Sequence, residues 1–124
     1  MITISIALIA GCIIEGIFVN KSFDDLIDSL ETYQVELDEN KDKIDTDELI
    51  YKINEINEKW TRRIKYLKSL IWHSGIKDIE IGVARLIVYV EENDYTEASA
   101  ELSSMIEFLK YYSEDFSFAI ENIF

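Results

Sequence analysis

Proline is absent from this chain of 124 residues, which also has only four glycines, one cysteine and one histidine. This scarcity favours long helices joined by short polar turns over a sheet protein, in which proline and glycine mark the turns. A single cysteine excludes an internal disulfide, and one cysteine with one histidine cannot form a usual zinc site. No Gly-rich phosphate loop and no nucleophile motif beside His73 is present, so we expect no enzyme, catalytic residue, cofactor or metal.

Basic residues are scarce as well, with 12 Lys and Arg against 25 Asp and Glu and a formal net charge of −13. Such a chain repels a phosphate backbone, so we expect no nucleic-acid partner. The exception is the segment Leu49–Trp72, which has six bases and two acids. We expect these bases to face acidic helices on either side, because like charges on neighbouring helices would repel.

The most apolar stretch is the first one, where Met1–Val19 carries only Thr3, Ser5 and Glu15 as polar residues. As a helix it would be about 28 Å long, close to the hydrocarbon thickness of a bilayer. We therefore predict a single-pass membrane anchor over residues 1–21, followed by a helical domain over residues 22–124. The expected location is the cell membrane, with the domain on the extracytoplasmic side.

Two alternatives for this stretch stay open. Ile9-Ala10-Gly11-Cys12 resembles the lipobox of a lipoprotein signal, which would make Cys12 an acylated residue, although no base precedes the apolar run and the hydrophobicity continues beyond Cys12. Ile2–Leu8 also alternates apolar and polar residues as a buried core strand would. No second strand-like stretch is available to pair with it.

After the anchor, apolar residues at steps of three and four predict four amphipathic helices. The first begins near Ser22 or continues directly from the anchor, and the polar stretch Asp38–Asp45 ends it. The second runs from Asp45 to Gly75, with Asp45 and Glu48 as a capping box. Gly75 would take the left-handed conformation at its end, with His73 near the last carbonyl groups.

The third predicted helix begins near Ile76, and its broad apolar surface predicts a central position in the packing. Asp94 and Glu97 form a capping box for the fourth helix, and Phe116–Phe124 would form a short final helix. The expected fold is therefore all-α: an antiparallel bundle of about four helices plus a short C-terminal helix, preceded by a membrane helix. The same apolar stripes would also fit a coiled-coil homodimer.

Charged residues of the central helix divide into paired and unpaired ones. Three acid-first pairs stand four residues apart: Glu48 and Lys52, Glu55 and Lys59, and Glu58 and Arg62. Arg63, Lys65 and Lys68 have no such local partner, so we expect them to bridge to another helix or to a ligand. Trp60 lies on the core stripe, whereas Trp72 at the helix end is expected to be half exposed. The predicted partner-binding residues are Arg63, Lys65, Lys68, Trp72 and His73.

These features predict a membrane-tethered helical module that interacts with a still unidentified protein. The tether, the unpaired bases beside an aromatic residue and the lack of catalytic motifs favour this interpretation. A membrane-associated sensor that binds a small anion or a cation within the bundle is the alternative.

A resemblance to a known family covers most of the chain. Its residues are the apolar N-terminus, Trp60, the run from Trp72 to Glu80, Ala84-Arg85-Leu86, Ala98 and Glu121-Asn122-Ile123. With these residues the chain resembles the bacterial family called domain of unknown function 4363. The resemblance implies a small, helical, membrane-tethered protein and carries over no catalytic residue.

Overall fold

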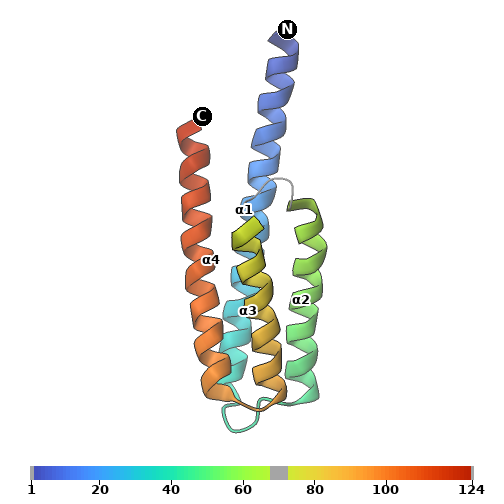
Figure 1. Ribbon diagram of the computed structural model, residues 1–124, viewed down its shortest axis with the longest axis vertical. Helices are drawn as coiled ribbons and strands as arrows, with labels where there is room; N and C mark the ends of the chain where they lie inside the picture. Colours follow the sequence, from blue (N-terminus) through green and yellow to red (C-terminus); the bar gives the residue numbers. More distant parts are fainter. Residues whose placement is uncertain (1, 68–72, 124) are drawn as a thin grey trace.

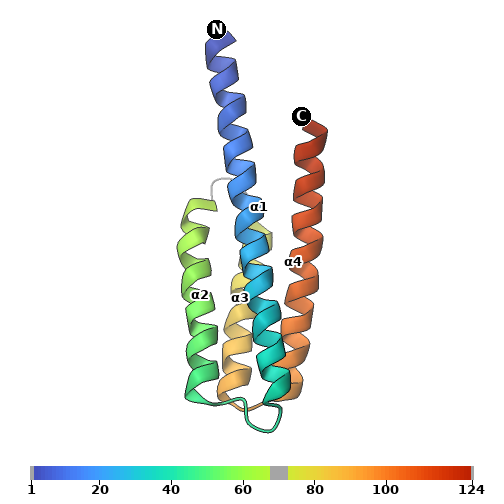
Figure 2. The ribbon, with the colours of Figure 1, turned by 180° about the vertical axis from the view of Figure 1, so that it is seen from behind.

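The computed structural model describes the backbone of residues 2–67 and 73–123 and the side chains of residues 6, 21–63, 65 and 77–111. It contains four helices, α1 (Ile2–Glu39), α2 (Asp47–Leu67), α3 (His73–Glu91) and α4 (Tyr95–Ile123). They run alternately in opposite directions, and each packs against two neighbours: α1 and α3 both contact α2 and α4 (Figures 1 and 2). The predicted all-α bundle of four packed helices is confirmed.

The core follows the apolar stripes of the sequence. Every helix contributes side chains at steps of three and four, and the largest fully buried ones are Trp60, Tyr33 and Phe23. The stripes that become buried include Leu26, Leu30, Tyr33 and Leu37 in α1; Leu49, Ile53 and Trp60 in α2; Ile79, Val83, Leu86 and Val90 in α3; and Ala98, Leu102, Met105 and Leu109 in α4. Amphipathic periodicity therefore determines which faces meet.

α1 is one unbroken helix, so the apolar run and the first amphipathic stretch form a single rod. The backbone is helical over residues 2–8, which makes the core-strand alternative wrong. Where side chains are described, no helix is long and apolar enough to cross a bilayer. Apart from Ile6, the side chains of the predicted anchor, including Cys12, lie outside that part.

The turn between α3 and α4 closes one end of the bundle. Asn93 adopts a left-handed conformation (φ 56°), and the N–H of Asp94 donates to the carbonyl oxygen of Tyr89 at 2.9 Å, a Schellman arrangement. The N–H of Glu97 donates to Asp94 Oδ1 at 3.1 Å, which confirms Asp94 as the cap of α4. Asn93 Oδ1 also accepts from the N–H of Ile44 at 2.8 Å, so this turn holds the α1–α2 loop.

Both predicted ends of the central helix are wrong. At its start Thr46, not Asp45, is the cap, because the N–H of Leu49 donates to Thr46 Oγ1 at 3.2 Å. At its far end α2 stops at Leu67, and His73 begins α3 with Gly75 inside that helix. A glycine without a following proline costs a helix only about 1 kcal/mol, so it is a weak stop signal.

Two further expectations need correction. Phe116–Phe124 is not a separate helix, because α4 continues unbroken from Tyr95 to Ile123. α3 is not more central than the other helices, since Ile81 and Val88 on its outer face are 40% and 47% exposed. Its broad apolar surface lies partly in solvent.

Candidate functional site

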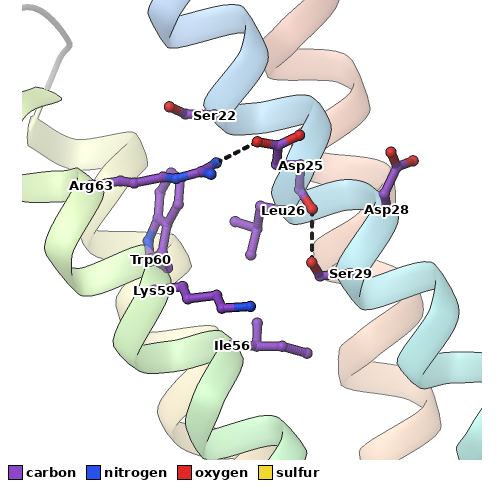
Figure 3. Close-up of a pocket in the computed structure, with 9 residues that line it drawn as sticks. All are labelled: Ser22, Asp25, Leu26, Asp28, Ser29, Ile56, Lys59, Trp60 and Arg63. Atoms are coloured by element: carbon purple, nitrogen blue, oxygen red, sulfur yellow. Dashed lines mark hydrogen bonds and ion pairs between the residues drawn. The ribbon is translucent and has the colours of Figure 1, made fainter.

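A hollow among the described side chains lies between α1 and α2, towards the end of the bundle away from the Asn93 turn (Figure 3). Its volume is about 320 Å³. The residues that line it are Ser22, Asp25, Leu26, Asp28 and Ser29 from α1 and Ile56, Lys59, Trp60 and Arg63 from α2. We call it the upper groove.

The walls of the upper groove are the flanks of two amphipathic helices. Ser22, Asp25 and Ser29 recur at steps of three and four beside the buried stripe of α1, and Ile56, Lys59 and Arg63 do the same on α2. The polar flanks therefore face each other across the apolar side chains of Leu26 and Ile56. This gives the groove an apolar floor and charged rims.

One ion pair crosses the upper groove. Arg63 of α2 lies 2.9 Å from Asp25 of α1, and the two side chains are 37% and 41% exposed. The prediction that Arg63 bridges to another helix is confirmed. Because both groups are partly in water, the pair adds little stability and can exchange partners readily.

Trp60 forms the back wall of the upper groove. It is only 2% exposed, as its place on the core stripe predicts, and its ring packs against Phe23 with centroids 5.8 Å apart. Its Nε1 is buried without a hydrogen-bond partner among the described residues. In Figure 3 this nitrogen lies on the ring edge turned away from α1, so the indole presents carbon atoms to the groove.

A second hollow of about 370 Å³ continues the groove along the same two helices and shares Asp28, Ser29, Ile56 and Lys59 with the first. We call it the lower groove. Lys52 lies 2.8 Å from Glu36 across it and 3.1 Å from Glu48 on its own helix. Hydrogen bonds to Glu36 and then to Glu48 raise the pKa of Lys52 above its ordinary value.

Tyr33 fixes the floor of the lower groove. Its hydroxyl donates to the carbonyl oxygen of Leu49 at 2.9 Å, a buried bond between α1 and α2. Burial, and secondarily the charge of Glu36, raises the pKa of Tyr33 far above its ordinary value. Tyr33 therefore stays neutral and acts as a structural tie.

The other ion pairs confirm the charge pattern of the sequence. Lys59 pairs with Glu55 at 3.2 Å and Arg62 with Glu58 at 3.7 Å, each four residues apart as predicted. Within the described residues, no three His, Cys, Asp or Glu side chains are close enough to hold a metal ion. The chemistry available in the groove is ion pairing and apolar contact.

Of the five predicted partner-binding residues, the two whose side chains are described, Arg63 and Lys65, lie on different sides of α2. Arg63 lines the upper groove, whereas Lys65 is exposed two residues further along α2, a spacing that places it on another side of the helix. Lys68 and Trp72 lie outside the described residues. His73 is the first residue of α3, so its predicted position at the end of the central helix is wrong, and its side chain is likewise outside the described part.

Sequence reasoning missed the α1 wall of the groove, in particular Asp25 and Ser29. Their signal in the sequence is a polar flank one step from the apolar stripe, which every amphipathic helix has. Only the register between α1 and α2 selects Asp25 as the partner of Arg63.

The protein is thus a small antiparallel four-helix bundle with a groove between its first two helices. The chain belongs to the family described as domain of unknown function (DUF4363), whose model matches residues 17–123, so the resemblance noted in the sequence is confirmed. No curated protein and no solved structure matches the chain.

Proposed function

We propose that this protein is a membrane-tethered interaction module, anchored by residues 1–19, that binds another protein through the upper and lower grooves between α1 and α2. The observation that carries the proposal is the projection of α1 beyond the bundle. Figures 1 and 2 show its outer part extending past the ends of α2 and α3.

The register of α1 and α2 supports the tether. Arg63 pairs with Asp25, and α2 ends four residues after Arg63, so in an antiparallel pair its end is level with about Lys21. The apolar run therefore starts at about the level where the described part of α2 ends. Ile6, the one residue of the run whose side chain is described, is 62% exposed. An exposed apolar helix of bilayer length is suited to a lipid environment.

The groove supports the protein partner. It combines an apolar floor with rims of both charges, which is the composition of a protein interface with a hydrophobic centre and a polar edge. The ion pairs of Arg63 and Lys52 are partly exposed, so a partner carrying both charges can replace one member of each pair.

Cell fractionation with intact-mass measurement tests the tether. We expect the full-length chain in the membrane fraction, and protease added to intact cells should digest the domain if it is extracytoplasmic. A shortened, lipid-modified chain that begins at Cys12 would replace the anchor with a lipoprotein. Full-length protein in the soluble fraction would contradict the tether.

Photo-crosslinking in native membranes tests the groove. A benzophenone amino acid at Lys59 or Thr32, both of which line the groove, should capture the partner. The matched control is Ser104, an exposed position on α4. Arg63→Ala should reduce capture at Lys59, whereas Arg62→Ala should not. Equal capture from Ser104, or no effect of Arg63→Ala, would contradict the groove as the binding face.

The alternative, a sensor for a small ligand, is favoured by the groove volumes of about 320 and 370 Å³, which lie in the range of small-molecule sites. A ligand that binds only the native state raises the melting temperature. Thermal shifts of the full chain in detergent against a panel of anions and divalent cations test this alternative. A shift lost in Arg63→Ala and kept in Arg62→Ala would support it over the protein partner, and a flat panel would contradict it.

A further inference from the structure

The last two turns of α4, Phe116–Ile123, extend beyond the rest of the bundle next to α1 (Figures 1 and 2). We call them the distal segment. Gly82 of α3 lies against Met105 of α4, and α3 begins nine residues before Gly82. In an antiparallel pair, α4 therefore continues about nine residues past the start of α3. Along this length the neighbour of α4 among the described helices is α1.

The register between α1 and α4 gives the height of the distal segment. Lys110 lies 3.0 Å from Glu31, and Gln34 donates to Ser103 at 2.8 Å. Both helices rise about 1.5 Å per residue in opposite directions, so Ile123 is level with the stretch Ile14–Phe18 of α1. This is about 2–8 Å inside the end of the apolar run at Val19.

The sequence changes character where the distal segment begins. Glu114 and Asp115 immediately precede it, and within it Glu121 is the one charged residue. Its apolar members are Phe116, Phe118, Ala119, Ile120 and Ile123, four of which follow helical spacing. The polar-to-apolar change in α4 therefore falls close to the height at which α1 changes from polar to apolar.

We infer that the distal segment of α4 enters the interfacial layer of the bilayer leaflet on the domain side, beside α1. The inference rests on the proposed tether: once residues 1–19 lie in lipid, any helix level with Ile14–Phe18 lies at the boundary of headgroups and acyl chains. Apolar faces of interfacial helices lie at such depths, about 5–10 Å below the headgroups. The partner of this surface is thus a lipid surface, in preference to a second copy or another protein.

Attachment to the membrane through both α1 and α4 would fix the orientation of the domain. A single anchor leaves the domain free to rotate and tilt, whereas α1 and α4 together fix its orientation. The upper groove begins at Ser22, within a turn of the end of the apolar run. Two-point attachment therefore holds this groove at the membrane surface, open to partners that are themselves in or on the membrane.

Depth-dependent fluorescence quenching tests the inference on the full chain reconstituted in phosphatidylcholine and phosphatidylglycerol vesicles. In a Cys12→Ser background, the environment-sensitive dye NBD is attached to one new cysteine at a time. Ile123→Cys and Phe118→Cys report on the distal segment, and the second position guards against misfolding of the first. Ala7→Cys reports on the anchor, and Ser104→Cys on an exposed position of the bundle.

We expect nitroxide-labelled lipids to quench both distal labels and the Ala7 label by about twofold or more, with headgroup nitroxides more effective for the distal labels, because interfacial helices lie at shallow depth. The Ser104 label should be unaffected. Quenching at Ala7 without quenching at either distal label would overturn the inference and leave the tether intact. No quenching at any position would overturn both. Distal labels protected from aqueous iodide but unquenched by lipid nitroxides would show a protein cover, which also overturns the inference.

Discussion

The two ends of the bundle are built differently. At the closed end, near the Asn93 turn, two hydrogen bonds tie the elements together: a buried one from Tyr33 to Leu49 and a partly buried one from Ile44 to Asn93. Towards the open end, α1 and α2 line the upper groove, where a partly exposed ion pair links Arg63 and Asp25. The closed end therefore fixes the register of the helices, whereas the open end keeps charged groups available to a partner and lies next to the proposed membrane.

We expect the largest loss of stability from alanine substitution of a buried leucine in α1, and two such leucines can be compared. Leu37 at the closed end is fully buried, whereas Leu26, 5% exposed, lines the upper groove. Leucine-to-alanine changes in a core cost about 2–5 kcal/mol, depending on how far the site can collapse. We expect Leu37→Ala to lie near the top of this range and Leu26→Ala near the bottom. Urea unfolding of the detergent-solubilised chain measures both, and equal losses would contradict a rigid closed end.

Removing the hydroxyl of Tyr33 should have the next largest effect. Tyr33→Phe removes the hydroxyl that donates to the buried carbonyl of Leu49, which keeps its bond within α2, at a cost of about 1 kcal/mol near pH 7. Because the folded-state pKa of Tyr33 is raised, the unfolded chain loses this proton near pH 10 while the folded chain keeps it. The contribution of Tyr33 is therefore complete below pH 10 and declines above it.

The pH dependence of the Tyr33→Phe effect follows directly. We expect the difference in free energy of unfolding between wild type and Tyr33→Phe to shrink as the pH rises from 9 to 11. The pKa of Lys52 is also raised, so its contribution to the stability of the fold also declines at alkaline pH. Lys52 is present in both chains, so its contribution cancels in the difference. A difference that grows with pH would contradict the buried, neutral state of Tyr33.

Substitution of Asn93 tests the link between the two loops of the closed end. Asn93→Ala keeps a Cβ at φ 56° but loses the short polar side chain with which asparagine tolerates this conformation, and it removes the acceptor of the Ile44 N–H. Asn93→Gly relieves the backbone strain but lacks the same acceptor. We expect Asn93→Ala to be the less stable of the two in thermal unfolding. The reverse order would show that the left-handed conformation is not required.

Removing the ion pair of the open end should have the smallest effect. Arg63→Met should change the free energy of unfolding by less than about 1 kcal/mol, because both partners are more than a third exposed. The matched control is Arg62→Met, which removes an exposed pair within α2. Urea unfolding at low and high salt measures both. A loss of several kcal/mol for Arg63→Met would make the pair a structural bond and contradict its availability to a partner.

The sequence predicts the features that depend on local signals, at both ends of the bundle. Asp94 as the cap of α4 and the pairs of Lys52, Lys59 and Arg62 require residues only three or four positions apart. The apolar stripes are equally local, so the four helices and most of the core could be read directly.

Other features depend on contacts between residues that are far apart in the sequence. The stop predicted at Gly75 is wrong because a glycine is tolerated inside a helix, and α3 already begins at His73. The sequence shows that Arg63 is a base without a local partner. Asp25 can be identified as its partner only from the register of α1 and α2 in the structure. The groove itself lies between the flanks of two helices, so no single helix encodes it.

The continuity of α1 has a mechanical meaning. Neither proline nor glycine occurs between Lys21 and Glu39, so this part of the helix is a stiff shaft whose outer end is the apolar run and whose inner end carries Asp25 and Glu36. The same shaft carries Tyr33, whose hydroxyl is bound to the carbonyl oxygen of Leu49. A force on the apolar run would thus reach the groove and the closed end together, with no hinge between them.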